Sequence, residues 1–211
     1  MLQEDAVEQQ TLELIRQLQK DPELEGFCLA GGTALALWLG HRKSEDIDLF
    51  GRKPFDAPAL LEHLEKTLGF AVQYMAKNTL KGIVNGIFVD IITHDYPLVS
   101  DCVRESGMAL YSEKDIAAMK VNVITGDGTR IKDFIDIYFL LRKYTMQEII
   151  SFYKKKYGLR NEFHALKSLA YFDDLDPAAP WPEMLKEKNL TLQKIKDTIR
   201  GEINRYMNAR I

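Results

Sequence analysis

The sequence predicts an α/β (α+β) fold in which a mixed sheet is followed by a bundle of helices. Up to about residue 110, short apolar runs bounded by turn residues alternate with segments of helical periodicity. Beyond residue 112, helical patterns follow one another without a strand pattern between them. We therefore expect an α/β core over residues 1–110 and a helical C-terminal region over residues 111–211, which 211 residues are enough to form.

The first half combines helical spacing with strand and turn signals. Leu12, Ile15 and Leu18 recur at helical spacing, and Asn85-Gly86 is the strongest hairpin signal in the chain. In chain order we expect a helix (4–20), a strand (27–32), a helix (33–39), a strand (46–50), a helix (56–69) and three strands (71–76, 80–84 and 87–93).

The second half shows helical periodicity throughout. Ser112, with Asp115 three residues later, resembles a helix cap, and Gly126-Asp127-Gly128 is typical of a turn between helices. The predicted helices cover 112–125, 129–143, 145–157, 161–172 and 190–209.

Composition and charge exclude several classes of protein. The net charge of −3 and the pI of about 5.9 argue against a general nucleic-acid coat, so any such contact needs a local basic patch. The apolar stretches are shorter than the roughly 20 residues of a membrane span, and the first ten residues do not resemble a secretory signal. Cys28 and Cys102 form no CxxC pair. We expect a cytoplasmic protein without membrane contact, in which both cysteines are packing residues.

Two aspartates interrupt the strand pattern of "SEDIDLFG" (44–51). Asp46 and Asp48 lie two residues apart and so point to the same face of a strand. Two like charges about 6.6 Å apart repel by roughly 2.5 kcal/mol at an effective dielectric constant of about 20. A bound cation would offset that repulsion.

A third carboxylate, Asp90, lies in the middle of the apolar strand "IFVDIIT" (87–93). A buried carboxylate needs a partner or a metal ion. If this strand pairs beside the one that carries Asp46 and Asp48, the three carboxylates converge. Oxygen ligands without His or Cys are typical of Mg²⁺ or Mn²⁺, and two such ions suit in-line attack on a phosphoryl group.

The D-x-D pair by itself leaves other interpretations open. Aspartates at the end of a strand are often only solvated charges. A glycosyltransferase of the D-x-D type also fits the pair, although such an enzyme would normally be longer and would need several parallel strands.

The stretch "LAGGTALAL" places Gly31 and Gly32 between a strand and a helix. Glycines there allow a phosphate to approach the backbone, and the helix N-terminus offers free N–H groups to an anion. The order of Gly-Gly, thirteen residues, Asp-x-Asp and a later Asp resembles the nucleotidyltransferase superfamily that includes DNA polymerase β. Within it, "LAGGTALALWLGHRKSEDIDLF" resembles the AbiEii/AbiGii nucleotidyltransferase toxins, as do "KDIAAMKVNVI" and "RIKDFIDIYFLL" farther along.

The resemblance covers about residues 27–142 and implies a role for each matching position. It implies that residues 1–110 are a polymerase β-like nucleotidyltransferase core. Asp46, Asp48 and Asp90 would be the catalytic, metal-binding carboxylates. The residues implied to bind the nucleotide are Gly31, Gly32, Thr33, Arg42, Ser44 and Lys120. Asp133 and Asp136 match the family's fourth motif.

The residues around Lys120 give partial independent support. Ile116, Met119 and Val123 form an inward stripe on the predicted helix, and Lys120 falls on that face. A lysine that points inward usually needs an anionic partner, although it could instead snorkel at the edge of the stripe. Asp133 and Asp136 share a helix face, and without the resemblance they would be interpreted as solvated charges.

Residues 142–167 contain a local excess of positive charge. The segment has seven basic residues and two acidic ones, and aromatic residues, among them Phe152, Tyr153, Tyr157 and Phe163, are interleaved with them. Such a pattern suits an RNA backbone with exposed bases. Helical spacing equally allows the aromatic residues to be core residues and the charges to be a solvated face.

We therefore expect an enzyme of the EC 2.7.7 type that transfers a nucleoside monophosphate from an NTP to an acceptor hydroxyl. Mg²⁺ or Mn²⁺ is the expected cofactor, and tRNA or another RNA, or else a protein, the expected acceptor. The resemblance implies the toxin of a toxin–antitoxin or phage-defence pair, with a separately encoded antitoxin. The alternatives are a small-molecule nucleotidyltransferase of the aminoglycoside-modifying kind and a non-catalytic module that binds a nucleotide or a partner.

Overall fold

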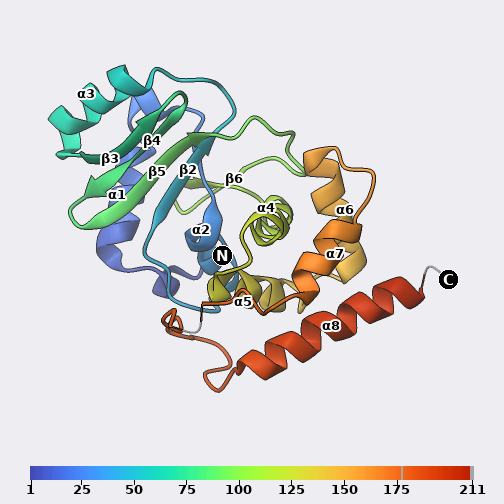
Figure 1. Ribbon diagram of the computed structural model, residues 1–211. Helices are drawn as coiled ribbons and strands as arrows, with labels where there is room; N and C mark the ends of the chain where they lie inside the picture. Colours follow the sequence, from blue (N-terminus) through green and yellow to red (C-terminus); the bar gives the residue numbers. More distant parts are fainter. Residues whose placement is uncertain (177, 210–211) are drawn as a thin grey trace. The chain divides into compact units, whose positions relative to one another are not determined.

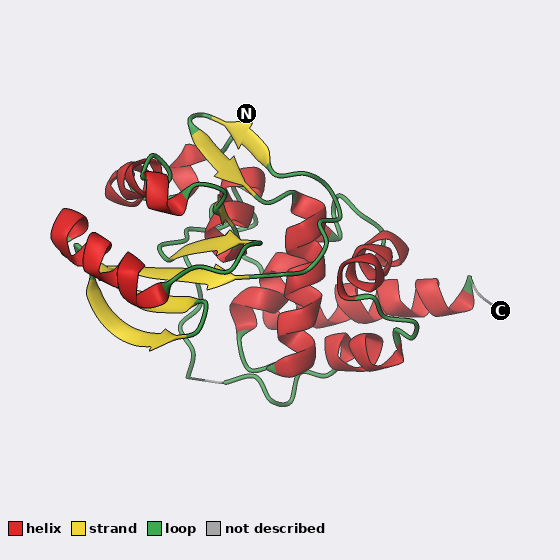
Figure 2. Cartoon of the chain, turned by 90° about the horizontal axis from the view of Figure 1, so that it is seen from above, coloured by secondary structure: helices red, strands yellow, loops and turns green. Residues whose placement is uncertain are grey.

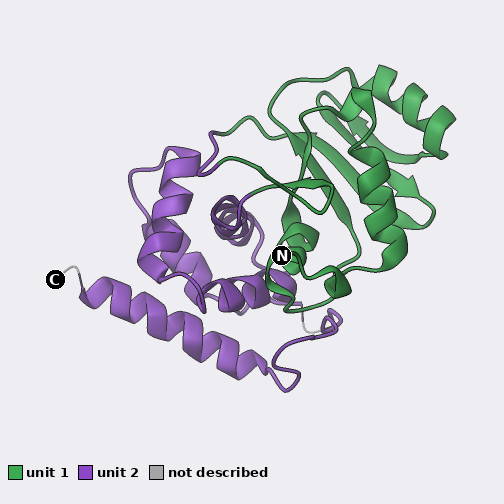
Figure 3. Ribbon diagram, turned by 180° about the vertical axis from the view of Figure 1, so that it is seen from behind, with its two compact units in different colours: residues 1–96, 101–111 green, residues 97–100, 112–211 purple. Residues whose placement is uncertain are grey.

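The computed structural model describes residues 1–176 and 178–209, which form two compact units (Figure 3). Unit 1 comprises Met1–Tyr96 and Asp101–Tyr111, and unit 2 comprises Pro97–Ser100 and the chain from Ser112 onward. Unit 1 holds a mixed seven-stranded sheet and unit 2 is helical. The predicted class, an α/β fold with a mixed sheet followed by helices, is confirmed.

Unit 1 contains all of the strands among the described residues (Figure 1). Its helices are α1 (Gln9–Leu18), α2 (Gly31–Leu39) and α3 (Ala57–Leu68), with short 3-10 turns at Glu4–Ala6 and Pro22–Leu24. Its strands are β1 (Cys28–Leu29), β2 (Ile47–Gly51), β3 (Ala71–Ala76), β4 (Thr79–Val84), β5 (Ile87–Thr93), β6 (Val103–Glu105) and β7 (Met108–Leu110). The predicted helix over 4–20 is thus shorter, because Val7 and Glu8 are extended.

The strands are ordered β3-β4-β5-β2-β1-β7-β6 across the sheet. Strands β2 and β5 run parallel, as do β1 and β7, whereas the other neighbours are antiparallel. The β6–β7 hairpin was not predicted from the sequence. Its strands are only three residues long, and its turn consists of Ser106 and Gly107, both with positive φ.

The central strands alternate between a buried face and a half-exposed face. Along β2, β4 and β5, the residues on one face are fully buried (Ile47, Leu49, Leu80, Val89 and Ile91). Helix α3 packs against β3 and β4 (Figure 2). The side chains between the buried ones point to the opposite face, which carries Lys81, Asp90 and Asp48. The apolar core therefore positions these charged groups on the accessible face.

Unit 2 consists of helices around α4 (Figure 1). The helices are α4 (Glu113–Gly126), α5 (Ile131–Leu140), α6 (Met146–Tyr157), α7 (Phe163–Ala170) and α8 (Leu192–Asn208). Helix α4 contacts α5, α6 and α7, and α8 packs across the same three neighbours. Each helix predicted for this half is present, with ends that differ by a few residues. None of the described helices is long and apolar enough to cross a membrane.

Candidate active site

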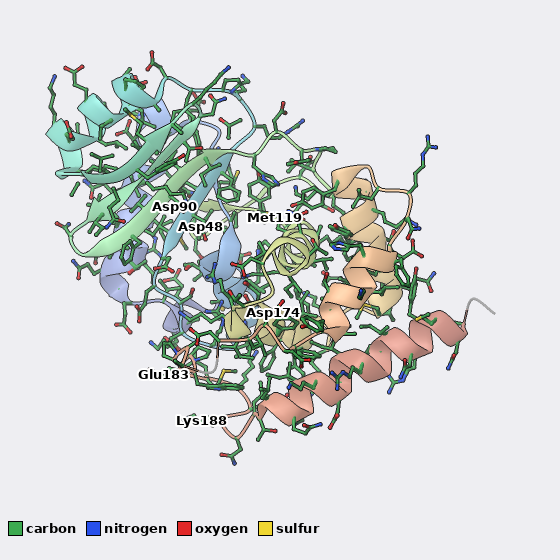
Figure 4. The ribbon with its side chains drawn as sticks, viewed as in Figure 1. Asp48, Asp90, Met119, Asp174, Glu183 and Lys188 are labelled. Carbon is green, nitrogen blue, oxygen red and sulfur yellow. The ribbon has the colours of Figure 1, made fainter. Side chains whose placement is uncertain are left out.

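Asp48 and Asp90 lie directly opposite each other on neighbouring strands. Strands β2 and β5 pair in parallel with Asp48 in register with Asp90, so both side chains are on the half-exposed face of the sheet. Figure 4 shows the two residues side by side. The strand pairing that the sequence analysis required for convergence of the carboxylates is therefore present.

Asp46 precedes β2 and is exposed. Its backbone carbonyl accepts a hydrogen bond from the hydroxyl of Thr33. Within the described residues, no group of three or more His, Cys, Asp or Glu side chains is arranged to hold a metal ion. The register thus brings together Asp48 and Asp90, while Asp46 lies just before the start of β2. Mutual repulsion disfavours a tight cluster of bare carboxylates.

Lys81 on β4 is the partner of Asp90. It lies opposite Asp90 in the antiparallel β4–β5 ladder, and its Nζ atom forms an ion pair with Asp90 Oδ2. The side chains retain 40% and 27% of their exposure, so the pair is accessible from solvent. Lys81 was not among the residues predicted from the sequence, although the Asn85-Gly86 turn indicates its pairing with Asp90. A two-residue turn pairs Val84 with Ile87, and counting three residues outward pairs residues 81 and 90.

The contacts at the first two residues of α2, Gly31 and Gly32, require glycine. Gly31 has φ +65°, and a Cβ atom there would lie 1.9 Å from Asp48 Oδ2. A Cβ atom on Gly32 would lie 2.7 Å from Nη2 of Arg42. The Gly-Gly pair therefore makes room for one carboxylate and one guanidinium at the N-terminus of α2, which has no side-chain cap.

The segment between α2 and β2 is held by buried polar groups. Thr33 and Arg42 are almost completely buried. The Thr33 hydroxyl lies 2.9 Å from the hydroxyl of Ser44, and Arg42 donates from Nη1 to the carbonyl of Lys43 at 3.0 Å. These contacts fix the loop that leads into the D-x-D strand. The predicted contacts of Thr33, Arg42 and Ser44 with a nucleotide stay predictions.

Lys120, Asp133 and Asp136 form a buried cluster inside unit 2. Lys120 Nζ lies 2.6 Å from Asp133 Oδ1 and 2.7 Å from Asp136 Oδ2. Asp133 Oδ2 is buried without a hydrogen bond and has Arg130 Nε at 3.8 Å. The inward lysine thus has its anionic partners, and the interpretation of Asp133 and Asp136 as solvated charges is wrong. The predicted contact of Lys120 with the nucleotide stays a prediction, as does the assignment of Asp133 and Asp136 to the family's fourth motif.

The positive charge of residues 142–167 is largely compensated within unit 2. Its ion pairs are Arg142 with Glu187, Lys143 with Glu113, Lys154 with Glu162 and Lys156 with Asp115. Lys156 and Asp115 are fully buried, and Asp115 also accepts from the backbone N–H groups of Val99 and Ser100. Of the aromatic residues, Tyr153 is buried whereas Phe163 is 67% exposed. The segment is therefore less basic in the folded chain than in the sequence.

Comparisons by sequence find a family and a relative of the chain. The family model described as "Nucleotidyl transferase AbiEii toxin, Type IV TA system" matches residues 13–86, which include Gly31, Asp46 and Asp48. An uncharacterized protein of Aquifex aeolicus (strain VF5), aq_aa25, is 36% identical over 154 residues, which cover 70% of this chain and 74% of the relative.

Solved structures share the fold at low sequence identity. MenT4, a nucleotidyltransferase toxin of Mycobacterium tuberculosis H37Rv, aligns with a TM-score of 0.54 and 15% identity, covering 90% of this chain and 82% of that one. The antibiotic-resistance factor ANT(2'')-Ia aligns with a TM-score of 0.54 and 16% identity, covering 68% and 88% respectively. The fold is that of nucleotidyltransferases, and by sequence the chain belongs to the AbiEii family of nucleotidyltransferase toxins.

Proposed function

We propose that the protein transfers a nucleoside monophosphate from an NTP to a hydroxyl group of an acceptor RNA and releases pyrophosphate. The observation that carries the proposal is the register of β2 and β5, which sets Asp48 opposite Asp90 on an accessible face. The Gly-Gly turn adjoins Asp48 directly, since Gly31 leaves no room for a side chain beside that carboxylate. Carboxylates beside an anion-binding turn suit chemistry on a triphosphate.

The donor chemistry of the predicted carboxylates suits a divalent cation, and the β2–β5 register brings two of them, Asp48 and Asp90, together. The side chains of Asp46, Asp48 and Asp90 are all carboxylates, the hard oxygen ligands that Mg²⁺ and Mn²⁺ prefer. They would hold the ions, which when bound would supply charge stabilisation to the triphosphate.

The chain's own groups would bind and orient the reactants. The N–H groups at the start of α2, which have no side-chain cap, would donate to a phosphate beside Gly31 and Gly32, and the helix dipole favours a phosphate there. In the proposed step the acceptor oxygen bonds to the α-phosphorus, and the bond from that phosphorus to the oxygen bridging to the β-phosphate breaks. The acceptor proton passes to the Asp90 carboxylate, and the electron pair leaves with pyrophosphate.

The biological setting is proposed from the family. The protein would act in the cytoplasm as the toxin of a toxin–antitoxin or phage-defence pair with a separately encoded antitoxin. Lys120 is proposed as a further nucleotide ligand, and tRNA or another RNA as the acceptor. Lys155, Arg160 and Lys167 are the basic side chains of residues 142–167 proposed to meet the acceptor backbone.

The decisive experiment follows the label of each α-³²P NTP, with Mg²⁺, into total tRNA, protein or small molecules. Asp48→Asn and Asp90→Asn should lower incorporation about a hundredfold or more, as loss of an electrostatic group at a reacting centre does. Asp95→Asn, an exposed carboxylate just beyond β5, is the matched control and should keep wild-type incorporation. Full incorporation by either active-site variant contradicts the proposal, whereas label in a small molecule favours the aminoglycoside-type alternative.

A further inference from the structure

We propose that Tyr74, Lys81 and Phe88 form the surface that binds the single-stranded end of the acceptor RNA, next to Asp90. This inference rests on the proposed function, which makes Asp90 the group that meets the acceptor hydroxyl. We call these three residues the acceptor surface. All three belong to unit 1 and to the β3–β4–β5 part of the sheet.

The register places the acceptor surface around the carboxylates. Tyr74 on β3 pairs with Lys81 on β4, Lys81 pairs with Asp90 on β5, and Asp90 pairs with Asp48 on β2. Residues opposite each other share a face of the sheet. A single row across four strands therefore carries an aromatic ring, an ammonium group and two carboxylates. Strands are about 4.8 Å apart, so Tyr74 lies about 10 Å from the Asp90 strand.

Phe88 flanks Asp90 along the strand. It precedes Asp90 by two residues on β5, hence on the same face and about 6.6 Å away. Its neighbour across β4 is Ile83, which is only half-buried. Any acceptor whose hydroxyl reaches Asp90 must lie over this face of the sheet. It would therefore lie beside Phe88 and Lys81.

The two aromatic side chains are unusually accessible. Tyr74 on the edge strand β3 is 56% exposed and Phe88 is 50% exposed, whereas Val89, on the opposite face of β5 from Phe88, is fully buried. Aromatic rings presented on the open face of a sheet are platforms on which unpaired nucleobases stack. Stacking requires bases that are not already paired, which favours a single-stranded end over a duplex.

The acceptor surface has positively charged groups beside its aromatic rings. Lys81 lies on β4, between the strands that carry Tyr74 and Phe88, and Lys77 in the β3–β4 turn adds a second exposed cation near the same hairpin. Ammonium groups attract phosphates and repel a polycationic aminoglycoside or a basic peptide. The stacking rings therefore favour RNA over the other candidate acceptors, and Lys77 and Lys81 supply positive charge for its phosphates beside the carboxylates of Asp48 and Asp90.

Equilibrium binding tests the acceptor surface without catalysis. A fluorescently labelled 12-nucleotide single-stranded RNA is titrated with the full-length chain, without NTP. Tyr74→Ala and Phe88→Ala should each weaken binding about tenfold or more, as loss of a stacked base does, and Lys81→Met should reduce both affinity and its salt dependence. Tyr74→Phe should restore binding, and a duplex of the same length should bind more weakly.

Met75→Ala is the matched control. Met75 lies beside Tyr74 on β3 with 43% exposure, but it pairs with Leu80 and so belongs to the opposite face. It should bind RNA like the wild type. Equal losses in Met75→Ala and Tyr74→Ala, or losses only in Lys155→Glu and Arg160→Glu of unit 2, overturn the inference.

The outcomes separate the two proposals. If the wild type labels RNA while Tyr74→Ala and Phe88→Ala leave the KM for RNA unchanged, the acceptor surface is wrong and the function stands. If RNA is never labelled yet these variants lose binding, the function is wrong and the surface stands. Label in a protein, with no binding of single-stranded RNA, contradicts both.

Discussion

Gly31 and Asp48 are in close contact, and any side chain larger than hydrogen at position 31 would overlap the Asp48 carboxylate. A Cβ atom at position 31 would lie 1.9 Å from Asp48 Oδ2 and 2.7 Å from Asp48 Cγ. The glycine motif and the aspartate motif are thus two halves of one packing arrangement. The Asp48 side chain fills the space that the missing Gly31 side chain leaves.

Gly31→Ala should therefore abolish nucleotidyl transfer and also destabilise unit 1. The substitution combines left-handed strain at φ +65°, about 1 kcal/mol or more, with displacement of the Asp48 carboxylate. Activity and urea unfolding measure the two effects. Gly26→Ala is the control, since Gly26 has φ +88° with no atom near its Cβ position, and it should show the strain without the loss of activity. Normal activity in Gly31→Ala would show that Asp48 can move without consequence.

Lys120→Met should destabilise unit 2 more than Asp136→Asn does. Removing the lysine leaves Asp133 and Asp136 as buried carboxylates without their cation, which costs about 3–5 kcal/mol. The Asn variant retains the Lys120–Asp133 pair. Urea denaturation gives both free energies of unfolding. Lys114→Met, an exposed position on the same helix, should stay within about 0.5 kcal/mol of the wild type. Wild-type stability in Lys120→Met would assign the lysine to ligand binding alone.

Cys28 should react with iodoacetamide at a lower pH than an ordinary thiol. A hydrogen bond from Cys102 lowers the pKa of Cys28 and the charge of Arg104 lowers it further, while burial partly opposes both. Both cysteines are free thiols. Peptide mass spectrometry after alkylation across pH 6–10 measures the midpoint, since only the thiolate reacts. Cys102→Ala should move the midpoint upward, and Arg104→Met should move it less. An unchanged midpoint in Cys102→Ala would show that the two thiols do not interact.

Glu187 should make the stability of unit 2 dependent on acidic pH. Burial raises the pKa of Glu187, but hydrogen bonds from Lys194 and Tyr138 and the charge of Arg142 outweigh it, so the pKa lies below 4.5. A carboxyl whose folded pKa is depressed stabilises the fold above its unfolded pKa, and that contribution disappears as the pH falls through the folded pKa.

The measurement compares wild type with Glu187→Gln by thermal unfolding between pH 7 and pH 3. The wild type should be more stable at pH 7, and the difference should shrink below pH 4.5. Glu183→Gln, an exposed glutamate in the same loop, should show no such pH dependence. If the difference in thermal stability between wild type and Glu187→Gln is the same at pH 3 as at pH 7, the charge of Glu187 does not cause it.

Local signals were sufficient to predict most of the fold. The helices of unit 2 follow from periodicity, and the β4–β5 hairpin follows from Asn85-Gly86, whose residues both have positive φ. The β6–β7 hairpin has a comparable turn at Ser106-Gly107, but strands of three residues carry too few side chains to show alternation. The break at Val7 was also missed, because helical spacing alone does not reveal where a helix begins.

The candidate site was predictable in its residues but only partly in its contacts. The pairing of Asp48 with Asp90 depends on which strands become neighbours. The pattern of the individual strands does not determine that β2 pairs with β5. The partners of Lys120 lie on the next helix, at a distance in sequence that no local rule connects. Lys81 is different, because the turn register already contained its pairing with Asp90. Counting outward from a tight turn therefore identifies cross-strand charge partners that composition does not.

The sheet is narrowest at β1, a strand of only two residues between β2 and β7. Leu29 alone pairs with both neighbours, with Leu49 on one side and Leu110 on the other. The β6–β7 hairpin is thus joined to the rest of the sheet by a single rung. Its amide hydrogens can exchange with solvent deuterium while β2 and β5 remain closed, so local fraying at that seam leaves the carboxylate-bearing strands aligned.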